Sequence, residues 1–110
     1  MKRGGRVRIV LVTCGNLAEA RRIARAVVER RLAACANIVL GPVESVYRWK
    51  DNVETARERL MIIKTTAARV AQLEREVKRL HKYEVPEFLV LPVAGGSREY
   101  LAWLTKVCEG

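Results

Sequence analysis

The sequence predicts an α+β fold of the ferredoxin-like, split βαβ kind, and two observations carry this prediction. Apolar residues recur at helical spacing over 17–32 and 67–82, and apolar, β-branched runs flank and separate these two stretches. The resulting order is β-α-β-β-α-β, followed by a short C-terminal helix. With 110 residues, 50% of them hydrophobic, the chain is long enough for one domain with a core. We therefore expect an antiparallel sheet with two helices on one face.

The first predicted helix is preceded by a strand and a tail. Residues 1–6 are basic and glycine-rich, so we expect a disordered tail there and a single domain over 7–110. The run 7–13 is almost wholly apolar and β-branched, which is typical of a strand buried on both faces. Asn16 can cap the helix 17–32, whose apolar residues form one stripe.

The middle of the chain predicts a long β-hairpin. After a strand over 33–40, alternation resumes at 43–49, and a strongly apolar strand occupies 60–65. Asp51 and Asn52 provide a turn between the last two strands. Such a hairpin is too long for a compact domain of this size, so its tip and the far side of the sheet need a cover. We therefore expect an oligomer.

The last third of the chain predicts a helix, a strand and a final short helix. The helix is expected over 67–82, and it must end before Pro86, because proline disfavours helical geometry at the preceding residue. The apolar run 88–93 predicts the last strand, and Ser97 can cap the final helix.

The chain is strongly basic, with a formal net charge of +9 and a pI near 10.1. Its basic residues are scattered and do not alternate with aromatic residues, so a nucleic-acid partner is not favoured. The three cysteines, Cys14, Cys35 and Cys108, form no CxxC pair, which indicates reduced thiols in a cytoplasmic protein. No apolar stretch is long enough to cross a membrane, so we expect no membrane partner.

Aromatic, histidine and cysteine residues are the candidates for a site. Tyr47 and Trp49 lie on one face of their predicted strand, where they are either packing and interface residues or walls of a ligand pocket. His81 stands three residues before Glu84, a spacing that can place two metal ligands on one helix face. The alternative is a structural histidine at a helix C-terminus, favoured there by the helix dipole. Cys35 is either an inert buried thiol or a ligand.

Known catalytic motifs do not occur in the sequence. It has no GxSxG, no HExxH and no glycine-rich phosphate loop. A Cys-His dyad would require Cys14, Cys35 or Cys108 beside His81, and the sequence leaves the positions of these thiols open. The sequence therefore gives little support to classical catalysis.

Several short stretches, in their order and spacing, resemble the CutA divalent-cation-tolerance family. They are "RLAACANI" at 31–38, "SVYRW" at 45–49, "ERLMIIKT" at 58–65, "HKYEVPE" at 81–87, "LPV" at 91–93 and "YLAWL" at 100–104. The resemblance covers nearly the whole chain. It implies a ferredoxin-like homotrimer, similar to the nitrogen-regulatory PII proteins, in which long hairpins wrap neighbouring subunits. It also implies a non-enzymatic cytoplasmic protein that binds copper(II) or another divalent cation and acts in tolerance of such metals.

Carried over by position, the resemblance implies which residues line the clefts between subunits. The matching residues are Cys35, Tyr47, Trp49, Glu58, Lys64, His81, Tyr83, Glu87 and Trp103. In a metal site His81 would be a ligand, with Cys35 or Glu84 as its partners. Lys82 departs from the family, which usually has proline there, and its positive charge would oppose a bound cation.

The alternative function is that of a PII-like signalling or binding trimer holding a small anionic metabolite in its clefts. The pocket residues would be Tyr47, Trp49, Lys64 and Tyr83, with Arg48 and Lys82 as further cations.

Overall fold

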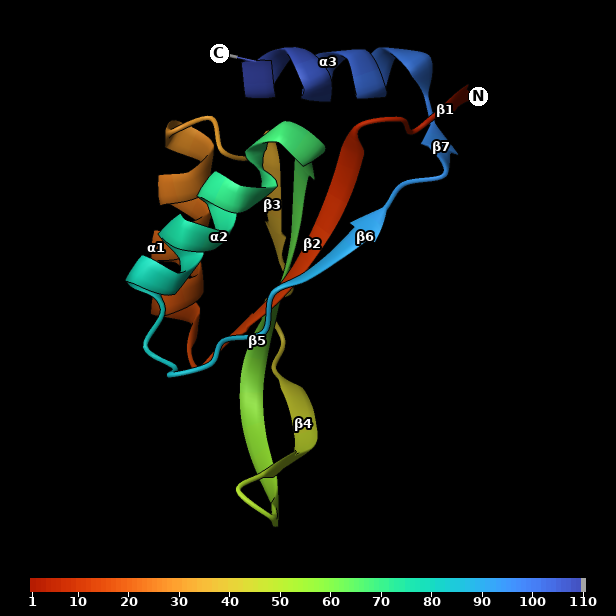
Figure 1. The fold of residues 1–110 in the computed structure, drawn as a ribbon. Coiled ribbons are helices and arrows are strands. Elements are labelled where there is room, and N and C mark those ends of the chain that lie inside the picture. The colour runs from red at the N-terminus through yellow and green to blue at the C-terminus, as the bar shows by residue number, and fades with distance from the viewer. Residues whose placement is uncertain (110) are drawn as a thin grey trace.

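The computed structural model describes residues 1–109 and confirms the predicted α+β fold (Figure 1). The strands are β1 (Lys2–Arg3), β2 (Val7–Cys14), β3 (Cys35–Ile38), β4 (Val43–Trp49), β5 (Asn52–Thr66), β6 (Leu89–Pro92) and β7 (Gly95–Gly96). The helices are α1 (Leu17–Glu29), the 3-10 turn η1 (Ala67–Arg69), α2 (Val70–Leu80) and α3 (Arg98–Glu109). The order is therefore the predicted one, with the short β1 and β7 added.

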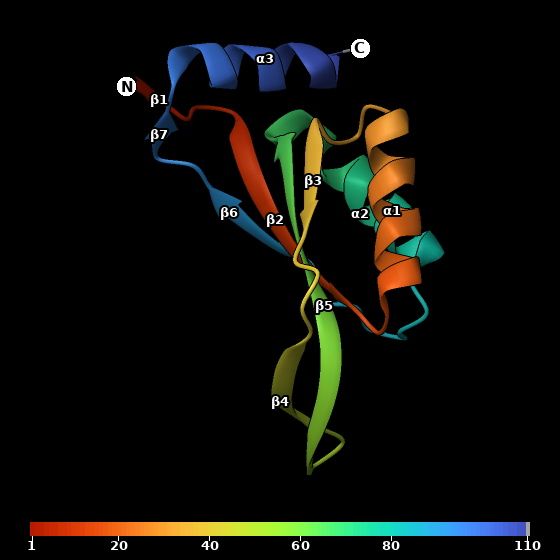
Figure 2. The same ribbon diagram turned by 180° about the vertical axis from the view of Figure 1, so that it is seen from behind.

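The main sheet is antiparallel, with the strand order β3-β5-β2-β6. Helices α1 and α2 lie side by side on one face of this sheet, and α3 crosses one end of it (Figures 1 and 2). Between the sheet and the two helices lies a core whose largest fully buried side chains include Ile23, Met61, Ile63 and Leu73. A smaller cluster beneath α3 includes Leu101 and Leu104. The predicted two-helix layer is thereby confirmed.

Strand β5 is long enough to take part in both the main sheet and a hairpin with β4. Its second part, Arg59 to Thr66, pairs with β2, whereas its first part pairs with β4 to form an arm that projects from the sheet (Figure 1). The molecule is accordingly elongated, with extents of 44 × 25 × 24 Å. The turn uses Lys50 and Asp51, both at positive φ, as a two-residue hairpin loop requires. The predicted hairpin is therefore confirmed, with its turn one residue earlier.

Element ends differ from the predictions by a few residues. Helix α1 ends at Glu29 rather than 32, because Arg31 adopts a left-handed φ of 57° and the Leu32 amide bonds back to the Val27 carbonyl. Strand β3 is shorter than the predicted 33–40.

The N-terminal segment was expected to be a disordered tail. In the structure Lys2 and Arg3 pair with Gly96 and Gly95, so β1 and β7 form a two-stranded ribbon. The Gly4 amide also donates a hydrogen bond to the Ala94 carbonyl. These contacts join backbone groups, and the paired residues show no apolar alternation from which the sequence could predict a strand.

The sheet face opposite α1 and α2 is largely uncovered. It carries the aligned apolar residues Ile9, Leu11, Leu60, Ile62, Leu89 and Leu91. Leu89 and Leu91 are 57% and 43% exposed, unusually high values for leucines in a sheet. An apolar face of this kind is typical of a surface that meets a partner.

Candidate functional site

Three ionisable side chains from separate elements meet where β2, α1 and α2 come together. Cys14 ends β2, Glu19 lies in the first turn of α1, and His81 follows the last residue of α2. Their ligand atoms lie within 4.8 Å of one another, and all three residues are buried. We call this group the polar cluster.

Glu19 holds the polar cluster together through backbone amides. Its own amide donates to the Asn16 side chain at 2.8 Å, which confirms Asn16 as the helix cap. Its carboxylate accepts from the Gly15 amide at 3.2 Å and from the Lys82 amide at 2.9 Å. Because Lys82 lies beyond α2, this carboxylate ties the end of one helix to the start of the other.

His81 uses both ring nitrogens within the chain. The Tyr83 amide donates to Nδ1 at 3.1 Å, so Nδ1 accepts and, in the neutral ring, Nε2 carries the proton. Nε2 then donates to the Thr13 carbonyl at 2.7 Å. The ring is buried and lies 4.7 Å from the Tyr83 ring, between centroids. These hydrogen bonds of His81 join the end of α2 to the end of β2.

Cys14 is fully buried beside these groups. Burial, aided by the negative charges of Glu19 and Glu58, raises the pKa of the Cys14 thiol to about 12. The thiol is therefore protonated near neutral pH. A thiol, an imidazole and a carboxylate form a donor set suited to copper or zinc. These donors fit a metal in type and spacing, but a metal would have to displace the proton of Cys14 and the bond from His81 to Thr13.

The predicted metal ligands are only partly brought together. His81 lies in the polar cluster, and Glu84 lies nearby on an exposed loop. Cys35 lies opposite Lys64 on β5, whereas Cys14 lies opposite Arg59. Five residues of strand separate these two points, so the two thiols are roughly 17 Å apart along the sheet. Cys14 rather than Cys35 is the thiol beside His81.

A groove of about 720 Å³ opens next to the polar cluster, at the base of the arm. Its lining residues are Thr13, Ser45, Val46, Tyr47, Trp49, Glu58, Lys82, Tyr83, Glu84, Val85 and Glu87. The predicted pocket residues Tyr47, Trp49 and Tyr83 therefore do meet in one place.

Within one subunit Lys64, the remaining predicted pocket residue, does not line this groove. Its Nζ approaches the Tyr100 hydroxyl at 3.3 Å and sits 5.5 Å from the centre of that ring, beneath α3. Arg48, one of the two further cations predicted for an anionic ligand, is bound on the arm itself, where its Nη1 donates to the Asp51 carbonyl. The arrangement therefore does not favour the anionic-metabolite function.

The groove is locally acidic. Glu58 is 7% exposed, although it belongs to the arm strand β5. Burial and then the Glu58 carboxylate raise the pKa of Glu87, and the same two causes raise the pKa of Tyr83. Both shifts show that Glu58 places negative charge in a poorly solvated part of the groove.

Cys14 and Glu19 are not among the site residues predicted from the sequence. Asn16 and Glu19 have the spacing of a capping box, and this was the available signal for Glu19. No sequence signal relates Cys14 to His81, because 67 positions of chain separate them and only the sheet and helix packing joins them.

Comparison with known proteins supports the resemblance seen in the sequence. Residues 8–107 match the family described as CutA1 divalent ion tolerance protein. A divalent-cation tolerance protein CutA from Thermus thermophilus is 50% identical over 96 residues, which are 87% of this chain and 92% of that protein. Protein CutA of Mus musculus is 46% identical over 105 residues, which are 96% of this chain and 59% of the mouse protein. This chain thus spans little more than half the length of the mouse relative.

Solved structures agree in fold. A divalent cation tolerance protein from Thermus thermophilus superposes with a TM-score of 0.89 at 47% identity, covering 91% of this chain and 96% of that one. CutA1 from a psychrotrophic Shewanella gives a TM-score of 0.91 at 37% identity, covering 96% and 97%. Among residues 1–109, no helix has the length and apolarity needed to span a membrane. The chain belongs to the CutA1 divalent ion tolerance family.

Proposed function

We propose that this protein acts in tolerance of divalent cations as a non-enzymatic, metal-binding homotrimer. Relatives at 50% and 37% identity bear the name divalent-cation tolerance protein. The observation that carries the proposal is the polar cluster, in which Cys14, Glu19 and His81 lie within 4.8 Å. Sulfur and nitrogen donors together suit copper(II) and zinc better than magnesium or calcium.

Binding at the polar cluster would be linked to proton release. The thiolate is the ligand form of cysteine, and the pKa of Cys14 is about 12 without metal. Affinity for copper should therefore rise with pH. The displaced hydrogen bond from His81 to Thr13 would also limit affinity, so a tolerance role would concern metal in excess rather than trace metal.

The trimer is supported by the uncovered sheet face and by the projecting arm. Aligned leucines on β6 leave an apolar surface that a neighbouring copy would cover. The arm projects from the sheet and carries polar and aromatic side chains that a neighbouring subunit could contact. Placement in the cytoplasm stays a prediction, since two relatives are named chloroplastic and one solved structure periplasmic.

Native mass spectrometry of metal-stripped protein, titrated with copper and then zinc, tests this proposal. We expect a trimer that takes up one copper per subunit, and we expect Cys14→Ser to lose this uptake. Cys35→Ser is the matched control, because it removes a thiol that lies far from His81. Equal uptake by all three proteins would contradict the polar cluster as the site. Loss of uptake in Cys35→Ser alone would favour the ligand set predicted from the sequence.

A further inference from the structure

The groove has the opposite charge from the rest of the protein. The chain carries a formal net charge of +9, yet the groove is lined by three carboxylates, Glu58, Glu84 and Glu87. The ammonium group of Lys82 is the single basic side chain among the lining residues. A cationic ligand would therefore meet a favourable local potential in a protein that otherwise repels it.

Glu58 is the most buried of the three carboxylates that line the groove. It is 7% exposed and lines the groove together with Tyr83. Among residues 1–109, the ion pairs involve Glu29, Glu74 and Glu76, and none involves Glu58. A buried carboxylate that lacks a counter-charge is costly, and a ligand cation would remove that cost.

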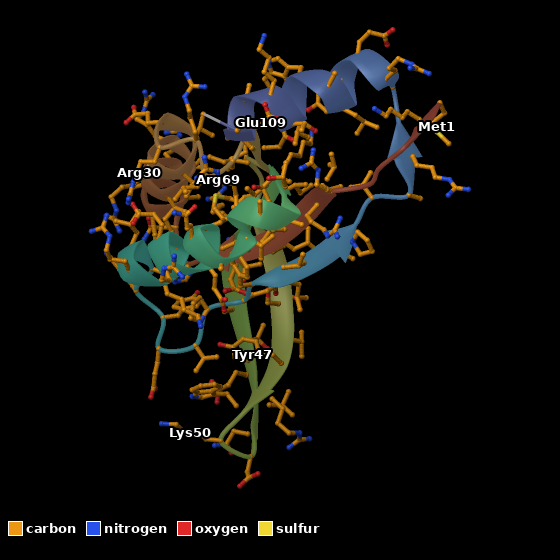
Figure 3. The ribbon with its side chains drawn as sticks, turned by 45° about the horizontal axis from the view of Figure 1, so that its top comes forward. Met1, Arg30, Tyr47, Lys50, Arg69 and Glu109 are labelled. Carbon is orange, nitrogen blue, oxygen red and sulfur yellow. The ribbon has the colours of Figure 1, made fainter. Side chains whose placement is uncertain are left out.

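Aromatic rings surround the same space. Tyr47 and Trp49 project from one face of β4, and Tyr83 comes from the loop after α2. In the single subunit all three rings are 38–44% exposed, so each presents part of its surface to the groove. The Nζ of Lys50 already lies 5.8 Å from the centre of the Trp49 ring, which shows that this ring accepts an ammonium group. Figure 3 shows Tyr47 and Lys50 together on the arm.

We propose that this groove binds a small organic ammonium compound, with the cationic group between the aromatic rings and the Glu58 carboxylate. Aromatic faces attract bulky, weakly hydrated cations, whereas they supply no ligand atom to a metal ion. A volume of about 720 Å³ is also that of a site for a small organic molecule. The proposed site uses different side chains from the polar cluster, and EDTA in the titrations below keeps metal binding out of the measurement.

Fluorescence of Trp49 tests the proposal directly. In a Trp103→Phe background Trp49 is the remaining tryptophan, since the chain has two. The probes are choline and its neutral isostere 3,3-dimethyl-1-butanol, titrated in EDTA at constant ionic strength with potassium chloride as the control salt. We expect a saturable change with choline, and at least tenfold weaker binding of the isostere. Equal binding of both probes would overturn the proposal, because it would show a merely apolar pocket.

Two variants test whether the choline-dependent fluorescence change requires the negative charge of Glu58. Glu58→Gln should weaken choline binding at least tenfold, whereas Glu109→Gln removes the same charge from the far end of α3 and should leave it unchanged. Figure 3 shows the separation of Glu109 from Tyr47. If Glu58→Gln fails to fold by circular dichroism, Tyr47→Leu serves instead and should also weaken binding at least tenfold. Unchanged choline binding in a folded variant of either kind would refute the proposal.

Discussion

Replacement of Glu19 by glutamine tests whether the polar cluster stabilises the fold. The Glu19 carboxylate is 2% exposed and accepts two backbone hydrogen bonds, from Gly15 at 3.2 Å and from Lys82 at 2.9 Å. Glutamine has the same shape but keeps one acceptor oxygen, so its NH₂ group must face one of these amides. One charge-assisted bond is lost and one buried N–H is left without an acceptor.

The expected change in the free energy of unfolding follows from the lost hydrogen bond and the unpaired amide. A hydrogen bond to a charged group contributes about 1.5–3 kcal/mol, and a buried donor without a partner costs about 1–3 kcal/mol. Because the two losses overlap at one amide, we expect the free energy of unfolding of Glu19→Gln to fall by about 3 kcal/mol. The variant Glu29→Gln is the control on the same helix, and its side chain is 65% exposed. Its single ion pair, with Arg25 at 3.7 Å, is exposed and should contribute less than about 0.5 kcal/mol.

Urea unfolding followed by circular dichroism measures both changes. The titrations are run in EDTA and at one protein concentration, since metal binding and subunit association both alter apparent stability. If the free energy of unfolding of Glu19→Gln lies within about 0.5 kcal/mol of that of Glu29→Gln, the carboxylate bridge between the helices does not stabilise the protein and our reasoning is wrong.

Three further outcomes are expected from other parts of the structure. Leu73 is fully buried, so Leu73→Ala should lower the free energy of unfolding by about 3 kcal/mol in the same urea assay, and a change below about 1 kcal/mol would contradict its place in the core. Hydrogen bonds from Arg79 and then from Arg30 lower the pKa of Glu76 to about 2, so the carboxylate stabilises the fold above its ordinary pKa of 4.5 and loses this effect as pH falls toward 2. Unfolding of wild type and Glu76→Gln at several pH values should show a stability difference at pH 7 that closes between pH 4.5 and 2, whereas a difference independent of pH would exclude this ionic origin. The buried Cys14 thiol should resist iodoacetamide at pH 8 in the native protein while the half-buried Cys35 reacts, as peptide mass spectrometry would show, and the reverse order would contradict the burial of Cys14.

The element types were predictable from local pattern. Helix α1 buries one face, so its apolar residues recur at helical spacing. Strand β2 is buried or half-buried on both faces, so its residues are apolar almost without interruption. Asn16 was predictable as a cap because capping uses atoms only three residues apart. The end of α1 was less predictable, because Arg31 adopts a left-handed conformation that is uncommon for arginine.

The candidate site was predictable only in part. Tyr47, Trp49 and Tyr83 were chosen as pocket residues, and they do line one groove. Lys64 was chosen with them, but the pairing of β5 with β3 and β2 sets it beside Tyr100 instead. A residue on a long strand can lie at either end of the molecule, and the sequence pattern does not say which end faces a pocket.

The fold, the hairpin and the family could be predicted from the chain alone, because each depends on short-range periodicity or on residues in a fixed order. Two features depend on packing: within one subunit Cys14 rather than Cys35 lies beside His81, and the groove is acidic although the chain is basic. The physical reason is the same in both cases. Strand register and helix packing bring together side chains from β2, α1, β5 and the loop after α2. Electrostatic interactions depend on the distances between these side chains in space, which the sequence does not give.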